Sequence, residues 1–254
     1  MKVPMKAETP EPTHSEYPMP FVRLELVVLS VCDDALQVLL SHRKEAPFKG
    51  KWGLPGGVLR IDLDATLEAA AQRVATERLG RKLPNLGQVA AVGGANRDPR
   101  ASWAMSVVFR SLVQADIETM PGKRVQALEW RAVADVITAK DLAFDHAALV
   151  AQASEAVRRE VREMRFPAGW MPEQFTLSEL QAMSEAVLGS PLDKVTFRRR
   201  IENTQAIQSL EGQMRQGGAH RPAQLYALAQ EVNGRKGDSE ERTNPHRTLP
   251  KTPA

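Results

Sequence analysis

Cysteine is nearly absent from this chain, which contains only Cys32 among its 254 residues. A lone cysteine forms no internal disulfide and supplies too few ligands for a zinc site. Cys32 lies in the apolar run LELVVLSVC, which predicts a buried structural thiol. The composition therefore excludes the disulfide-rich secreted class of protein and indicates a cytoplasmic one.

Long hydrophobic runs are missing as well. A membrane-spanning helix needs about 18 or more apolar residues, and the chain has no such stretch. The N-terminal MKVPMKAETPEPTHSEYPMP lacks the apolar segment of a signal peptide. The net charge of +3 is only mildly basic. We therefore expect a cytoplasmic protein without a membrane partner.

The chain is long enough for two ordinary hydrophobic cores, and its pattern divides into four segments. Residues 1–18 and 231–254 are polar and proline-containing, which predicts a disordered arm and a disordered tail. Residues 19–155 mix strand and helix patterns and predict an α+β sandwich. Residues 156–230 are expected to hold the end of a linker helix and a second domain.

The first domain is expected to begin with a β-hairpin, because VRLELVVLSV and LQVLLSHR flank a bend at Asp33–Asp34. A Pro/Gly-rich loop then leads to DATLEAAAQRVATERLG, a predicted helix with Asp64 as N-cap and Gly80 as its end. The later predicted elements are strands at LGQVAAVGG, SWAMSVVFRSLVQ and VQALEWRAV and a long helix over 145–164.

One segment, LPGGVLRIDLDATLEAAAQRVATERLG, places a Gly-Gly turn ahead of a helix that carries Arg73 and Glu77. This layout resembles the Nudix box of pyrophosphohydrolases, G-x5-E-x7-R-E-U-x-E-E-x-G-U, in which U is aliphatic. Val74 and Arg78 stand where that pattern has glutamates, and the spacing from Gly57 to Arg73 is longer than in the pattern. The box is therefore degenerate.

Magnesium prefers several hard oxygen ligands, and this helix retains only Glu77 as a weak candidate. Arg78 would repel a divalent cation, and Glu68 lies too far along the helix from Glu77 to share one ion. The other possible substitutes are Asp62 and Asp64. Alternatively, Arg73 and Glu77 form an ordinary i,i+4 ion pair. We expect no catalytic residue, no metal and no cofactor, with Mg²⁺ required only if residual hydrolase activity remains.

The second domain shows the element order of a winged helix-turn-helix. FTLSELQAMSEAVLG predicts a helix with a Thr176–Glu179 capping box. SPLDKVTFRRRIENTQ predicts a second helix with Asp193 as N-cap, and AIQSLEGQMRQGGAHRPAQLYAL predicts a hairpin.

On a helical wheel, Phe197 and Ile201 of the second helix share a core-facing side, and Arg199 points away from it. Arginine can read guanine edges and asparagine can read adenine in the major groove, while basic residues of the hairpin can reach phosphates. The expected DNA-binding residues are Lys194, Thr196, Arg198, Arg199, Arg200, Asn203, Arg215 and Arg221. Alternatively, the arginine triplet is a solvated helix face, or the winged helix docks on a protein.

Several local features follow one another in a specific order. They are YPMP, LPGG with its box, RDPRASW, FDHAALVAQA, FTLSELQ, DKVTFRRRI and HRPAQLY. Over about residues 17–228, this order resembles the NrtR family, the Nudix-related transcriptional regulators of NAD metabolism. The resemblance implies a Nudix-like α/β/α sandwich with a C-terminal winged helix, in a homodimer on a palindromic operator in double-stranded DNA. It also implies a nucleotide effector such as ADP-ribose.

The effector site is expected at the Gly-Gly turn, the box helix and the RDPR segment. Its predicted residues are Gly56, Gly57, Arg60, Arg73, Arg97 and Arg100, of which the last two could contact phosphate bidentately. Alternatively, RDPR is only a charged turn held by Pro99. We expect a transcriptional regulator of the repressor kind, because a sensor gains nothing from destroying its signal. The competing hypothesis is a Nudix pyrophosphohydrolase acting on ADP-ribose or a related nucleotide.

Overall fold

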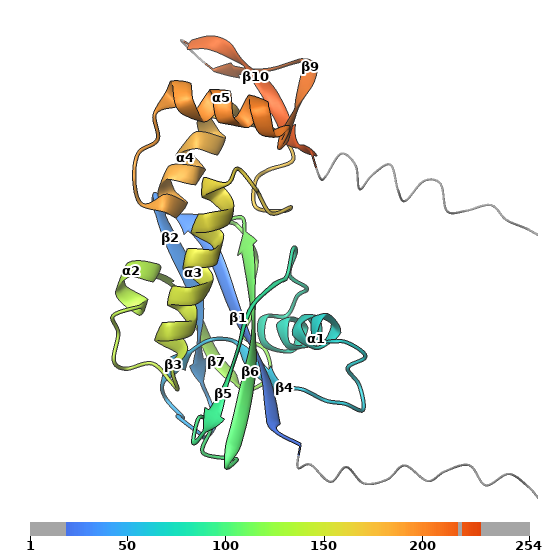
Figure 1. Cartoon of the computed structure of the whole chain (residues 1–254), viewed down its shortest axis with the longest axis vertical. Coiled ribbons are helices and arrows are strands. Elements are labelled where there is room, and N and C mark those ends of the chain that lie inside the picture. Colours follow the sequence, from blue (N-terminus) through green and yellow to red (C-terminus); the bar gives the residue numbers. More distant parts are fainter. Residues whose placement is uncertain (1–18, 218–219, 230–254) are drawn as a thin grey trace, which may run out of the picture.

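The structure is a computed structural model that describes residues 19–217 and 220–229. The arm and tail predicted to be disordered lie outside the described residues. Two parts follow one another along the long axis of the molecule (Figure 1). The larger contains a seven-stranded sheet, and the smaller contains a three-stranded sheet. Within the described residues, no helix is long and apolar enough to cross a membrane.

The seven-stranded sheet is mixed, and β1 (Phe21–Cys32) lies at its centre. β1 runs parallel to β6 (Trp103–Val113) and antiparallel to β2 (Ala35–Arg43). Asp33 and Asp34 between β1 and β2 both have positive φ, as a tight two-residue hairpin turn requires, which confirms the predicted hairpin. The remaining strands are β3 (Trp52–Gly53), β4 (Gly56–Val58), β5 (Gly87–Ala95) and β7 (Val125–Ala132).

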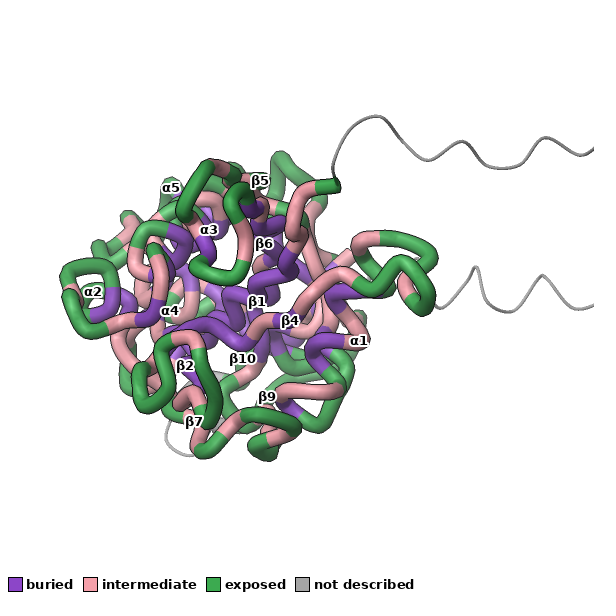
Figure 2. Tube along the Cα trace, turned by 90° about the horizontal axis from the view of Figure 1, so that it is seen from below, coloured by how far each residue is buried: buried purple, intermediate pink, exposed green. Residues whose placement is uncertain are grey.

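Helices cover both faces of this sheet. Successive side chains of β1 point to opposite faces, so its apolar residues contribute to two separate hydrophobic clusters. Leu24, Leu26 and Val28 contribute to a hydrophobic cluster with α1 (Leu67–Leu79). Val27, Leu29 and Val31 contribute to a second cluster with α3 (His146–Arg162). Figure 2 shows the buried β1 between these layers. The predicted α/β/α sandwich is confirmed. A short helix, α2 (Val133–Val136), precedes α3.

Two local predictions in this part are wrong. The N-cap of α1 is Thr66, whose side-chain oxygen accepts a hydrogen bond from the Ala69 amide at 3.1 Å. Asp64 does not cap the helix, because its carboxylate is used by Arg60 and Arg73 instead. Cys32 is half-buried rather than buried, because it is the last residue of β1 and adjoins the exposed turn. Gly80 ends α1 in the left-handed conformation, as predicted.

The smaller part has the winged helix order. α4 (Leu177–Leu188) begins with the predicted capping box, in which the Thr176 side chain accepts from the Glu179 amide at 3.2 Å. The Glu179 carboxylate accepts from the Thr176 amide at 2.7 Å. Asp193 caps α5 (Lys194–Thr204), as predicted. The three-stranded sheet contains β8 (Phe175–Thr176), β10 (His220–Leu228) and β9 (Ile207–Gly217), in that order.

The two parts share one hydrophobic core. A single cluster of buried residues extends from Val27 in β1 and Leu149 in α3 to Phe197 and Ile201 in α5. A hydrogen bond of 3.2 Å from Arg158 Nε in α3 to the carbonyl of Val187 in α4 adds a polar link. α3 therefore packs against both the sheet and the winged helix.

Candidate functional site

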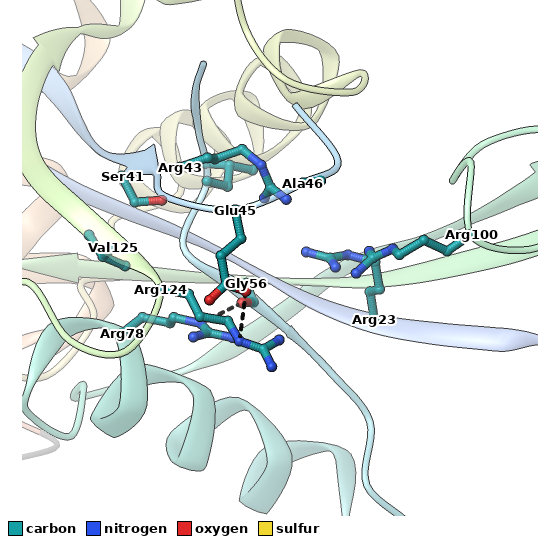
Figure 3. Close-up of a pocket in the computed structure, with 11 residues that line it drawn as sticks. Arg23, Ser41, Arg43, Glu45, Ala46, Gly56, Arg78, Arg100, Arg124 and Val125 are labelled. Carbon is teal, nitrogen blue, oxygen red and sulfur yellow. Dashed lines mark hydrogen bonds and ion pairs between the residues drawn. The ribbon is translucent and has the colours of Figure 1, made fainter. Parts of the chain in front are cut away.

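A cleft lies beside β4 and the C-terminal half of α1 and consists of two adjoining hollows, one of which is shown in Figure 3. The hollows share Arg23, Arg78, Arg100 and Arg124. The other basic lining residues are Arg43, Arg60, Arg73 and Lys123, and the acidic ones are Glu45 and Glu77. This excess of positive charge favours an anionic ligand with several negative oxygens.

The structure brings most of the predicted effector residues together at this cleft. Gly56, Gly57, Arg60, Arg73 and Arg100 line one or both hollows. Arg97 does not lie with them. Its guanidinium is paired with Asp145 at the start of α3, and it lines a separate narrow cavity with Glu25 and His146.

The two glycines are required by close packing around β4. A Cβ atom on Gly56 would lie 2.0 Å from the Glu25 Oε2 atom of β1. A Cβ atom on Gly57 would lie 2.7 Å from a methyl carbon of Val74 in α1. Val74 is itself fully buried, in place of a glutamate of the box pattern. The two glycines therefore let β4 pair with β1 and pack closely against the box helix.

Arg73 connects the loop after β4 to α1. Its Nε and Nη2 atoms donate to the two Asp64 oxygens at 2.7 and 2.8 Å, and Nη2 also donates to the Val58 carbonyl at 2.9 Å. The bond with Arg73 holds the pKa of Asp64 below its usual range. The predicted i,i+4 pair with Glu77 is present at 3.2 Å. Arg73 thus fixes the shape of the cleft wall.

Arg78 is held by carbonyl groups rather than by a carboxylate. Its Nε atom donates to the Gly56 carbonyl at 2.9 Å and its Nη1 atom to the Lys123 carbonyl at 2.5 Å. Burial lowers the pKa of Arg78, and repulsion from Arg124 and Arg23 lowers it further, against an opposing effect of Glu77. Among the described residues, no carboxylate forms an ion pair with this guanidinium.

The RDPR turn presents a paired arginine. Arg100 Nε donates to the Asp98 carboxylate at 2.8 Å, and the Arg100 amide donates to the same oxygen at 3.0 Å. The guanidinium also lies over the Phe21 ring, 4.9 Å from its centroid. The charged turn that we considered as an alternative is therefore present, and it still places Arg100 on the cleft.

Sequence reasoning did not identify several basic residues of the cleft. These residues are Arg23, Arg43, Arg78, Lys123 and Arg124. They come from β1, β2, the end of α1 and the loop before β7, which no local motif connects. One signal was available: Arg23 and Glu25 are charges two residues apart in an otherwise apolar strand, and they form a buried ion pair of 2.7 Å.

The residues at the box do not fit a magnesium ion. Glu77 accepts from Arg73, and both oxygens of Asp64 are engaged by Arg73 and the Arg60 amide. Asp62 is paired with the Arg60 side chain at 2.8 Å. Across residues 19–217 and 220–229, no group of three or more His, Cys, Asp or Glu side chains is arranged to hold a metal. Such an ion needs several oxygen ligands.

The outer face of α5 is a second candidate site. Phe197 and Ile201 are buried, as the wheel predicted. The exposed residues of this helix include Lys194, Thr196, Arg198, Arg199, Arg200 and Asn203. Arg200 donates to the Arg162 carbonyl at the end of α3. On the wing, Arg215 pairs with Glu179 of α4 and donates to the Gln174 carbonyl at 3.1 Å. The side chain of Arg221 lies outside the described part of the structure.

The two parts of the chain match two known families. Residues 23–153 match the NUDIX domain family, and residues 167–228 match the NrtR DNA-binding winged helix domain. A curated relative from Acinetobacter baylyi, the ADPR responsive transcriptional repressor NtrR, is 36% identical over 215 residues. That alignment covers 85% of this chain and 84% of the relative.

Two solved structures from Shewanella oneidensis are similar in fold and sequence. NrtR complexed with a 27mer DNA is 30% identical with a TM-score of 0.68, over 84% of this chain and 95% of that one. The NUDIX domain of NrtR complexed with ADP ribose is 31% identical with a TM-score of 0.52, over 57% and 94%. With its degenerate box, its basic cleft and its winged helix, the chain belongs to the NrtR family of Nudix-related transcriptional regulators.

Proposed function

We propose that this chain is a transcriptional repressor that binds operator DNA through α5 and the wing, and ADP-ribose through the basic cleft. One observation carries the proposal: the NrtR-type winged helix and a Nudix domain with an arginine-rich cleft share a continuous hydrophobic core. A ligand that changes the packing of the cleft can then change the orientation of α5. The relatives described above are a repressor responsive to ADPR and proteins complexed with DNA and with ADP ribose.

The roles of the individual residues belong to this proposal. Diphosphate oxygens would bind the arginines of the cleft, because guanidinium groups match phosphate bidentately. Base edges would be read from α5, with Arg199 and Asn203 as the residues best placed to point away from the core. We further propose a homodimer acting in the cytoplasm on a palindromic operator, because a two-fold dimer presents two equivalent recognition helices.

The experiment is a gel-shift titration of the full-length protein against the promoter region that adjoins its own gene. A specific complex that survives competitor DNA and responds to ADP-ribose supports the proposal. If no specific complex forms with that region at moderate salt, the proposed DNA-binding role is wrong. If the complex forms and Arg199→Ala leaves it unchanged, α5 is not the reading element.

A pyrophosphohydrolase is the second function to test, because Glu77 does line the cleft. Its mechanism would require Mg²⁺, and the engaged carboxylates around Glu77 do not fit that ion. The assay is release of AMP from ADP-ribose in the presence of Mg²⁺, with Glu77→Gln as the comparison. We expect no turnover above the level of Glu77→Gln.

A further inference from the structure

We propose that the guanidinium of Arg78 takes the place of the divalent cation in this cleft, so that a diphosphate group binds here without metal. The inference rests on the proposed function and deepens it, because it names the group that neutralises the effector's charge. Arg78 stands at a glutamate position of the box pattern, so the exchange replaces a metal ligand by a permanent cation.

Arg78 lies on the box helix at the wall of the cleft. It projects from the last turn of α1 and is anchored by the carbonyl oxygens of Gly56 and Lys123. Figure 3 shows its guanidinium beside Gly56, near Arg124 and facing the same cleft as Arg23 and Arg100. It lines both hollows, together with Arg23, Arg100 and Arg124, so a ligand that occupies both hollows can contact it.

Three neighbouring arginines of the cleft have carboxylate partners, whereas Arg78 and Arg43 bond to carbonyl groups. Arg23 pairs with Glu25, Arg100 with Asp98 and Arg124 with Glu45. Arg78 makes bonds to carbonyls only, and within the described residues it has no ion-pair partner. The charge of Glu77 offsets only part of the cost of burying Arg78, because the pKa of Arg78 is still lowered. A partly buried cation without an ion-pair partner is stabilised when an anion joins it. A diphosphate would supply that anion.

The same charges oppose a metal ion. A divalent cation at the box would lie among Arg73, Arg78 and Arg124, and the carboxylate that lines this hollow, Glu77, is already bonded to Arg73. Each of these guanidinium groups repels a cation and attracts a phosphate. The site is therefore selective for an anion that arrives without Mg²⁺, and magnesium bound to the diphosphate should compete with Arg78 for it.

The test is calorimetric titration of the full-length protein with ADP-ribose, once in EDTA and once in excess Mg²⁺. We expect the affinity in EDTA to equal or exceed that in Mg²⁺. Arg78→Gln should weaken binding roughly ten- to a hundredfold, the range for loss of charge-assisted hydrogen bonds, and Arg78→Lys should retain part of the affinity. The matched control is Arg81→Gln, because Arg81 also donates to a carbonyl, that of Glu118, but lies outside the cleft. Melting temperatures of all variants separate loss of binding from loss of folding.

Two results would overturn the inference: binding by the parent protein that requires Mg²⁺, or a folded Arg78→Gln variant that binds like the parent. Inorganic pyrophosphate, titrated in the same way, separates this inference from the proposed effector. If pyrophosphate binds in EDTA and depends on Arg78 while ADP-ribose does not bind, the cation replacement stands and ADP-ribose is the wrong effector. If neither binds in either buffer, both are wrong.

Discussion

His146 faces Glu25 across the end of the sheet, with its Nε2 atom 3.8 Å from the Glu25 carboxylate and both side chains only 1% exposed. The Leu54 amide donates to His146 Nδ1 at 2.8 Å, which leaves the ring proton on Nε2, toward Glu25. The other Glu25 oxygen accepts from Arg23, which lines the cleft. Arg23, Glu25 and His146 therefore form a chain of contacts from the cleft to the first residue of α3.

Replacing Glu25 by glutamine should destabilise the fold by about 3–5 kcal/mol at neutral pH, because it leaves the buried Arg23 without its partner charge. Urea unfolding of the full-length protein measures this loss. Glu129→Gln is the matched control, since Glu129 forms an exposed ion pair with Arg131, which is worth little. Equal stability of Glu25→Gln and the control would contradict the assigned role of the pair.

The effect of Glu25→Gln on stability should depend on pH. Burial alone would raise the pKa of Glu25, but Arg23 and His146 outweigh it and hold the pKa at about 2. A depressed pKa contributes stability above the ordinary value of 4.5 and loses it as the pH falls toward 2. The stability difference between the parent and Glu25→Gln should therefore shrink over that interval. The two stabilities should be compared at about pH 5, above the interval, and at about pH 2.5, near its lower end. A stability difference that is the same at both values would contradict this assignment.

Phe197→Ala and Arg199→Ala should have opposite effects. Removing the buried ring of Phe197 should lower the free energy of unfolding by about 3–5 kcal/mol. Arg199 is exposed, so its loss should leave folding nearly intact and weaken specific operator binding by about 1–3 kcal/mol. Melting temperature and operator affinity, with a scrambled operator as the control, distinguish the two. If the effects are exchanged, the reading face of α5 has been assigned to the wrong side.

Substitutions of Arg215 and Glu179 should change the affinity for all DNA sequences by a similar factor. Arg215→Ala should lower affinity for specific and scrambled DNA together and reduce the salt slope by about one, as loss of a phosphate contact does. Glu179→Gln should do the reverse, because it releases Arg215 from its ion pair and glutamine can still serve in the capping box. Salt titrations of binding measure both. Unchanged slopes in both variants would remove Arg215 from the DNA contact.

Arg158→Ala should weaken the coupling between ADP-ribose binding and operator binding while leaving each affinity nearly unchanged. Its side chain links α3 to the Val187 carbonyl of α4 and lies in neither candidate site. We expect near-normal affinity for ADP-ribose alone and for operator alone, but a smaller effect of each on the other. Arg162→Ala is the control, because that exposed arginine pairs with Glu155 of its own helix. Equal coupling in both variants would show that α3 does not transmit the signal through this contact.

Local sequence signals predicted the elements that depend on neighbouring residues. The capping box at Thr176, the cap at Asp193 and the core face of α5 are all present as expected. The cap at Asp64 was wrong because a carboxylate that can reach an arginine in three dimensions is not free to cap a helix. Propensity at one position cannot reveal that competition.

The candidate site was less accessible to sequence reasoning than the fold. The box fixed the place of Gly56, Gly57 and Arg73, but the arginines that dominate the cleft come from distant segments. Arg43 enters from β2 and Arg124 from the loop before β7, so only the strand pairing brings them together. Arg97, expected at the phosphate, is instead paired with Asp145, because α3 begins beside the RDPR turn.

The central claim is that effector and operator sites are coupled through one core, and fluorescence anisotropy of labelled operator with and without ADP-ribose tests it most directly. By linkage, ADP-ribose should change the operator affinity by the same factor by which operator changes the ADP-ribose affinity, typically about 5- to 150-fold. Operator affinity that is identical at zero and saturating ADP-ribose, with both ligands shown to bind, would contradict the account.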